Sequence, residues 1–140
     1  MTGAVVLDTG SLVAVLNRRD RYHRWATEQW GEIEPPLLTC EPGLAEACYL
    51  LRDVAGGRAT VLELVSRDVV TIPFRIDAEA GGIARLLERY ADLPASLADV
   101  CLVRMIEQHP GSRVLTLDRD FRVYRVHGRR VIPTLMPADL

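Results

Sequence analysis

Lysine is absent from this chain, and all 17 of its Lys and Arg positions are arginine. Response-regulator receivers need a lysine opposite an acidic pocket, and P-loop NTPases need one in their phosphate loop, so both classes are excluded. Cysteine is scarce as well: Cys40, Cys48 and Cys101 are too widely spaced for a zinc site. We expect three reduced thiols among apolar residues, as in a cytoplasmic protein.

The sequence also lacks an uncharged apolar run of about 18 residues and a basic, apolar leader, so neither membrane insertion nor secretion is expected. It has 140 residues, of which 49% are hydrophobic, which fits one domain spanning residues 1–140. Strand-like and helix-like segments alternate without repeats or long linkers. This order predicts an α/β fold with a mostly parallel central sheet.

Hydrophobic spacing, prolines and glycines place the expected elements. Thr9 and Ser11 can cap the first helix, and Ser96 can cap the last one. Strands are expected at residues 4–8, 37–39, 69–72, 114–117 and 131–135, and helices at residues 9–17, 22–33, 42–54, 59–66 and 77–90 and after Ser96.

Four acidic residues lie next to apolar stretches, where an uncompensated carboxylate is costly. Asp8 and Asp118 follow buried strands, whereas Glu46 and Asp99 lie in helical patterns. If these segments pack side by side, the four carboxylates meet at one end of the parallel sheet, where ligands of open α/β folds bind. Carboxylates a few ångströms apart repel by roughly 1 to 4 kcal/mol per pair. The cluster therefore predicts a hard divalent counter-ion, Mg²⁺ or Mn²⁺.

Two other acidic motifs are excluded by their context. The tetrapeptide Asp8-Thr9-Gly10-Ser11 matches the active-site sequence of aspartic proteases, but those enzymes are all-β, and residues 11–17 have helical spacing. A haloacid dehalogenase would require a second aspartate two residues after Asp8, where Gly10 stands.

Taken together and in this order, four segments resemble the PIN-domain ribonucleases, especially the toxin halves of VapBC-type toxin–antitoxin pairs. The segments are Val5–Leu12, Glu41–Leu51, Asp92–Val100 and Thr116–Phe121, and each contains one of the four acids. The resemblance implies a three-layer α/β/α PIN-like (Rossmann-like) fold. It also implies that Asp8, Glu46, Asp99 and Asp118 are the catalytic residues.

The implied chemistry is metal-assisted hydrolysis of RNA phosphodiester bonds. Mg²⁺ (or Mn²⁺), held by Asp8, Asp99 and Glu46 or Asp118, would orient a water and lower its pKa. Two neighbouring acids, Asp92 and Asp120, could substitute for or supplement the assigned residues, whereas Glu41 precedes Pro42 and is expected in a loop.

Two hydroxyl residues, Ser11 and Thr116, are candidates for steadying the carboxylates, although a helix cap and an ordinary strand residue explain them equally well. Arg119, Arg122 and Arg125 are candidates for binding the RNA backbone. Genome composition explains the exclusive use of arginine equally well. His23 and His127 are assigned to surface or packing roles rather than to catalysis.

Partners also follow from the resemblance: an RNA substrate, an antitoxin protein and a second copy of the chain. Trp25, Trp30 and the apolar face from Leu12 to Leu16 could supply a homodimer surface or, equally, belong to the core. The alternative function is a non-catalytic PIN-like module that binds RNA or protein. The intact acidic set argues against that alternative, because a module without metal would gain by losing crowded negative charge.

Overall fold

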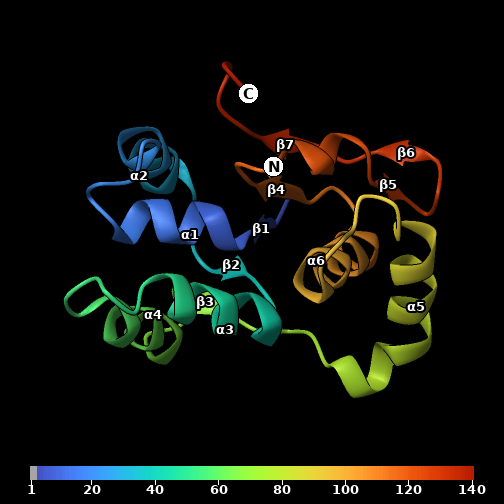
Figure 1. Ribbon diagram of the computed structural model, residues 1–140, viewed down its shortest axis with the longest axis horizontal. Coiled ribbons are helices and arrows are strands. Elements are labelled where there is room, and N and C mark those ends of the chain that lie inside the picture. The colour runs from blue at the N-terminus through green and yellow to red at the C-terminus, as the bar shows by residue number, and fades with distance from the viewer. Residues whose placement is uncertain (1–2) are drawn as a thin grey trace.

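Five short strands form one parallel sheet in a computed structural model that describes residues 3–140 (Figure 1). The strand order is β3-β2-β1-β4-β7, so β1, the first strand of the chain, lies at the centre. These strands are β1 (Val5–Leu7), β2 (Leu37–Leu38), β3 (Val70–Thr71), β4 (Arg113–Leu115) and β7 (Thr134–Leu135). Every neighbouring pair is parallel, which confirms the predicted α/β class.

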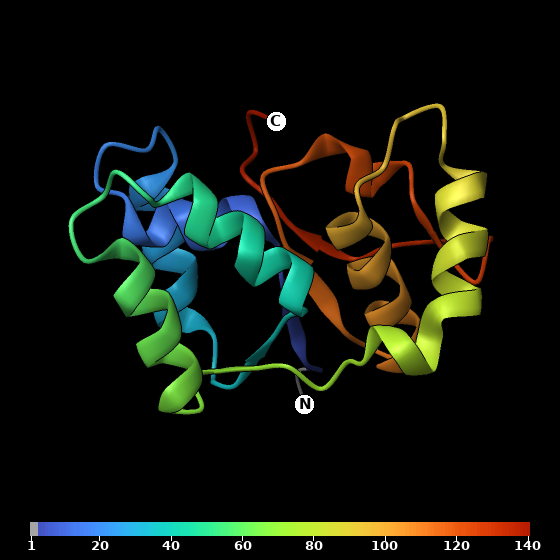
Figure 2. The same ribbon diagram turned by 60° about the horizontal axis from the view of Figure 1, so that its bottom comes forward.

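Helices cover both faces of the sheet, as Figures 1 and 2 show. One group comprises α1 (Thr9–Leu16), α2 (His23–Glu32), α3 (Glu41–Leu50) and α4 (Gly57–Ser66); the other comprises α5 (Ile76–Arg89) and α6 (Leu97–Gln108). Adjacent strand residues point to opposite faces, so Val6 packs in the core under α5 and α6, while Val5 and Leu7 pack in the core on the other face. The three layers of the predicted fold are therefore present.

The carboxyl-terminal third contains two elements that the hydrophobic pattern did not predict. A 3-10 helix, η1 (Arg119–Arg122), follows β4, and a two-stranded antiparallel hairpin pairs β5 (Arg125–Val126) with β6 (Arg130–Val131). The strand expected at residues 131–135 is accordingly wrong as a single element, because Val131 ends the hairpin and Thr134 begins β7.

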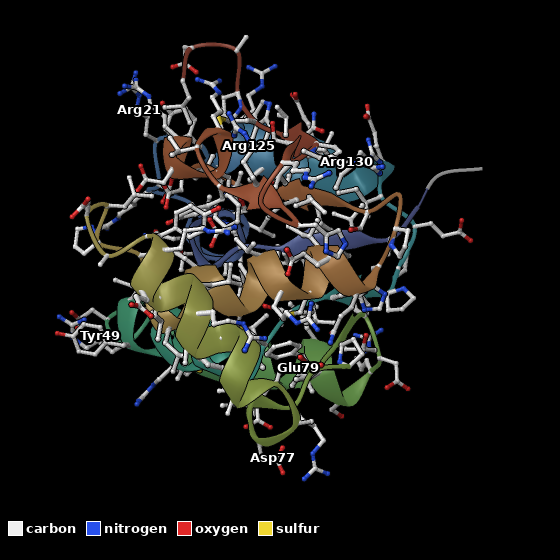
Figure 3. The ribbon with its side chains drawn as sticks, turned by 90° about the vertical axis from the view of Figure 1, so that its right-hand side faces the viewer. Arg21, Tyr49, Asp77, Glu79, Arg125 and Arg130 are labelled. Atoms are coloured by element: carbon white, nitrogen blue, oxygen red, sulfur yellow. The ribbon has the colours of Figure 1, made fainter. Side chains whose placement is uncertain are left out.

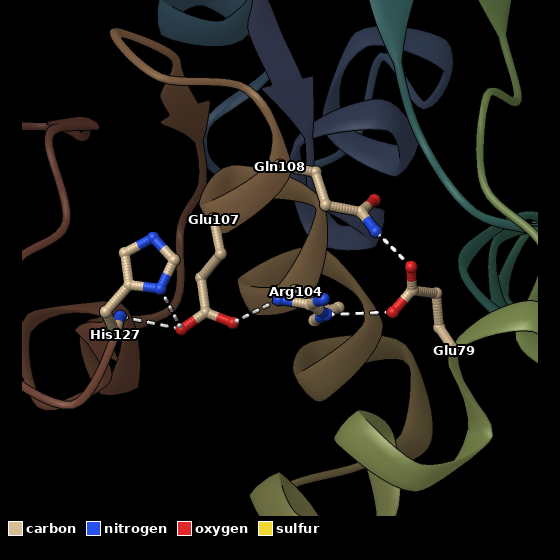
Figure 4. Close-up of polar contacts among 5 residues, drawn as sticks. All are labelled: Glu79, Arg104, Glu107, Gln108 and His127. Carbon is tan, nitrogen blue, oxygen red and sulfur yellow. Dashed lines mark hydrogen bonds and ion pairs between the residues drawn. The ribbon is translucent and has the colours of Figure 1, made fainter.

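Polar contacts join α6 to α5 on one side and to the β5–β6 hairpin on the other (Figure 4). Arg104 of α6 donates to Glu79 of α5 at 2.9 Å and to Glu107 at 3.3 Å. Glu107 in turn accepts the backbone N–H of His127, in the β5–β6 turn, at 2.6 Å. Through these contacts, one helix fixes the elements on both of its sides.

The two tryptophans of α2 contact the core only in part. Trp25 and Trp30 of α2 pack against the core that contains Leu12 and Val13 of α1. Leu12 and Val13 are buried in that core, whereas Trp25 and Trp30 are half-buried and keep part of their surface exposed. Cys40 and Cys101 are buried, Cys48 is half-buried, and all three are free thiols, as predicted. Within residues 3–140, no helix has the length and apolar character needed to span a lipid bilayer.

Candidate active site

The four predicted acids line one open cavity of about 510 Å³ at the carboxyl ends of β1 and β4. Asp8 follows β1 directly, Asp118 lies three residues after β4, Glu46 comes from the middle of α3, and Asp99 lies in the first turn of α6. The remaining lining residues are Thr9, Gly10, Leu50, Leu117, Arg119 and Leu140. Side chains more than a hundred positions apart in the sequence thus share one cavity.

Asp8 is held at the base of the cavity by two donors. Its Oδ1 accepts the backbone N–H of Thr9 at 2.8 Å, and its Oδ2 accepts the hydroxyl of Thr116 at 2.6 Å. Asp8 is also the residue that caps α1, so the predicted caps, Thr9 and Ser11, are wrong. A carboxylate at this position lies at the positive end of the α1 dipole.

The pKa of the Asp8 carboxyl is raised to about 7, mainly by burial and additionally by the negative charges of Asp99 and Asp118, against the opposing effect of the Thr116 and Thr9 hydrogen bonds. Burial, followed by the charges of Asp99 and Asp118, also raises the pKa of Glu46, although that side chain is more exposed. The carboxylates therefore interact electrostatically across the cavity, as the sequence argument required.

Asp99 has two structural roles besides facing the cavity. It forms the predicted cap of α6 reciprocally: Ser96 Oγ accepts the backbone N–H of Asp99 at 3.0 Å, and Asp99 Oδ2 accepts the backbone N–H of Ser96 at 3.1 Å. Asp99 Oδ2 also accepts the hydroxyl of Tyr124 at 3.3 Å. These bonds fix the orientation of the carboxylate at the start of the helix.

Asp118 is oriented by the turn into η1. Its Oδ1 accepts the backbone N–H of Asp120 at 2.9 Å, and its own N–H donates to Thr116 Oγ1 at 2.9 Å. Burial raises the pKa of Asp118, and the charges of Asp120 and Asp99 add to this effect against the opposing bond from the Asp120 amide. Thr116 therefore contacts two of the four acids, the arrangement expected of a supporting residue.

The other candidates differ in position. The Ser11 side chain is fully buried, and its hydroxyl has no hydrogen-bond partner in the part of the chain described. Asp120 lies beside the cavity without lining it, and Asp92 is exposed in the loop before α6. Glu41 is the first residue of α3, so its expected place in a loop is wrong; it too lies outside the cavity lining.

The three arginines predicted to bind RNA lie in different environments. Arg119 lines the cavity, and Arg122 is exposed on η1. Arg125 donates through Nη1 to the carbonyl oxygens of Arg122, Val123 and Tyr124, at 2.6 to 3.1 Å. This guanidinium therefore binds the carbonyls at the end of η1, and Arg119 is the candidate best placed to meet a phosphate in the cavity.

Tyr124 is a site residue that the sequence did not indicate. It is fully buried, and its ring packs edge-on against Tyr90 and Phe121, with centroid separations of 4.9 and 5.1 Å. Burial and the charges of Asp99, Asp118 and Asp120 raise the pKa of its hydroxyl, so the group stays a proton donor to Asp99. It lies in an arginine-rich stretch of the sequence, which is typical of exposed surface, so only the tertiary fold reveals the contact.

The donor set of the cavity fits a hard divalent cation in kind, because it consists of carboxylate oxygens whose mutual repulsion such a cation would relieve. Within residues 3–140, however, no three His, Cys, Asp or Glu side chains already form a ligand set for a metal ion. The acids share one cavity, but their present conformations do not converge on a single point.

Comparison with known proteins agrees with this architecture. The family model of the PIN domain matches residues 5–126. Among solved structures, the VapC20 toxin of Mycobacterium tuberculosis, described as cleaving the sarcin–ricin loop, superposes with a TM-score of 0.66 at 21% sequence identity. The match covers 75% of this chain and 82% of that one, and at such identity it shows a common fold. No curated protein matches the chain. Since the family model spans most of its length, this chain belongs to the PIN domain family.

Proposed function

We propose that this chain is a metal-dependent endoribonuclease, and that it acts as the VapC-type toxin of a toxin–antitoxin pair. One observation carries the proposal: Asp8, Glu46, Asp99 and Asp118 come from four separate segments and line the same cavity. The likeness to a toxin that is described as cleaving the sarcin–ricin loop supports RNA as the substrate class.

In this proposal, Asp8, Asp99 and Glu46 or Asp118 hold Mg²⁺ or Mn²⁺. A bound divalent ion supplies a water of lowered pKa and offsets the charge that develops on the phosphate. The protein's own part is orientation. Thr116 and the Thr9 amide hold Asp8, while Tyr124 and the Ser96 amide hold Asp99. Arg119, which lines the cavity, is assigned to the phosphate.

The test is cleavage of labelled RNA by the purified protein with Mn²⁺ or with EDTA. We expect cleavage with Mn²⁺, loss of cleavage with EDTA, and loss in the Asp8→Asn variant. Asp92→Asn is the matched control, because it makes the same change at an exposed position outside the cavity lining.

Two results would contradict the proposal. Cleavage that survives both EDTA and Asp8→Asn would identify a contaminating nuclease. RNA binding without cleavage in any divalent metal would instead favour the non-catalytic binding module.

The proposal extends to the chain's organisation and partners. We propose a single domain over residues 1–140, a cytoplasmic location, a homodimer, and a cognate antitoxin that approaches the acids or arginines of the cavity. Light scattering of the purified protein gives the oligomeric state, and copurification with the product of an adjacent gene tests the antitoxin.

A further inference from the structure

Tyr49 is a strongly exposed aromatic residue beside the acidic cavity. It has 62% of its surface exposed and lies on α3, one turn after Glu46. Figure 3 shows it projecting away from the body of the molecule. The next residue, Leu50, is 46% exposed and lines the cavity itself. An exposed aromatic ring at this position has no role in the core.

Arg52 fixes the orientation of the Tyr49 ring. Its guanidinium carbon lies 4.1 Å from the ring centroid, and its Nη1 donates to the carbonyl oxygen of Tyr49 at 2.8 Å. Asp53 Oδ2 lies 3.9 Å from Arg52 Nε. A cation stacked on an aromatic face in this way is favourable. The pair therefore forms a flat, partly rigid surface that remains largely open to solvent.

A second cavity lies next to Arg52, and none of the four acids lines it. It has a volume of about 690 Å³ and is lined by residues 52–59 and Leu62. Arg52 and Arg58 contribute two positive charges to it, against the single negative charge of Asp53. Leu62, which is 56% exposed, adds an apolar wall. Leu50, the last residue of α3, lines the acidic cavity, and Arg52, two residues later, lines the second cavity.

We infer that Tyr49 and Arg52 form a stacking platform for an unpaired base next to the cleaved phosphodiester, with Arg52 and Arg58 binding the flanking backbone. This inference rests on the proposed function and specifies its substrate class as single-stranded or looped RNA. Stacking on an aromatic ring needs a base whose face is free. In a duplex, both faces of each base are covered by neighbours, so the platform selects against paired RNA.

The test measures RNA binding rather than cleavage. All proteins carry Asp8→Asn and are kept in EDTA, so the RNA stays intact. Affinities for a labelled single strand and for the matching duplex are compared in the parent, Tyr49→Ala, Tyr49→Trp and Val131→Ala proteins. Val131, which is 64% exposed on β6, is the matched control for removing exposed apolar surface.

We expect Tyr49→Ala to weaken single-strand binding about tenfold, as loss of one stacked base does, and to leave duplex binding unchanged. Tyr49→Trp should retain the affinity, and Val131→Ala should match the parent. The fluorescence of a 2-aminopurine placed in the strand should fall when the parent protein binds, and should fall less when Tyr49→Ala binds.

Equal single-strand affinity in Tyr49→Ala and Val131→Ala would overturn the inference. So would a change in the particle mass of Tyr49→Ala by light scattering, because the surface would then be a contact between copies of the chain. The nuclease proposal fails separately: if the protein without Asp8→Asn binds single strands through Tyr49 but never cleaves them, the platform stands and the catalytic function falls.

Discussion

At the scale of single residues, three of the four acids also begin helices. Asp8 caps α1, Asp99 completes the cap of α6, and Asp118 caps η1. Asp8 and Asp118 were predictable because each follows an apolar strand pattern, which leaves a local signal in the sequence, but the capping role of Asp8 was not predicted. Thr116 was predictable for the same reason, since it lies next to a strand end. The contact of Tyr124 was not, because it depends on how α6 and the segment after η1 pack together.

Removing the Tyr124 hydroxyl should weaken the site without disturbing the core. In Tyr124→Phe, the ring contacts with Tyr90 and Phe121 remain, but Asp99 loses a donor. We expect the Mn²⁺ concentration for half-maximal cleavage to rise about tenfold or more, as for other residues that orient metal ligands. Mn²⁺ binding measured by calorimetry should show the same change.

Tyr90→Phe is the control for this variant. It removes a hydroxyl of the same kind, but one that accepts the backbone N–H of Arg125 and contacts no acid of the cavity. An identical Mn²⁺ requirement in the two variants and the parent would show that the Tyr124 hydroxyl does not orient Asp99.

At the scale of elements, the sequence predicted the positions of the long helices and of the first four sheet strands along the chain more accurately than the carboxyl-terminal turns. Helices such as α5 and α6 repeat their apolar residues over several turns, which makes their periodicity readable. In contrast, β5 and β6 have two residues each, too few for an alternating pattern. Their position depends on Glu107, which accepts the His127 amide from another element.

Arg104 should therefore contribute measurably to folding stability. Its side chain is 30% exposed and lies between Glu79 and Glu107, which are 21% and 8% exposed. Replacement by methionine keeps the apolar stem but leaves two partly buried carboxylates without their cation. We expect the free energy of unfolding in urea to fall by roughly 1 to 3 kcal/mol.

Arg75→Met is the matched control. Arg75 pairs with Asp77 at 2.7 Å, but both side chains are largely exposed, so water screens the pair and little change is expected. If both variants unfold at the same urea concentration, the contacts of Arg104 do not stabilise the packing of α5 on α6.

At the scale of the whole molecule, the acidic cavity should make folding stability depend on pH. The pKa of Asp8 is about 7 in the folded protein and 3.8 for an ordinary aspartate. The Asp8 carboxyl thus binds its proton more tightly in the folded state than in the unfolded state. The contribution of Asp8 to stability is therefore fully present below pH 3.8 and is lost as pH rises through about 7. The expected loss is roughly 2 to 4 kcal/mol.

Urea unfolding in EDTA, at several pH values between about 4 and about 8, checks this expectation. Asp8→Asn cannot titrate, so its free energy of unfolding should fall less over that range than that of the parent. Parallel pH profiles for the two proteins would mean that Asp8 keeps an ordinary pKa in the folded state.

The position of β4 in the sheet has a consequence for synthesis of the chain. A ribosome delivers Asp8, Glu46 and Asp99 first, but β1 pairs with β4, whose residues emerge only after position 112. Until then the central strand has one neighbour missing, and Asp118 has not yet been translated. If the completed protein cleaves RNA, a product truncated before β4 should lack that activity, because it has neither the partner strand of β1 nor Asp118.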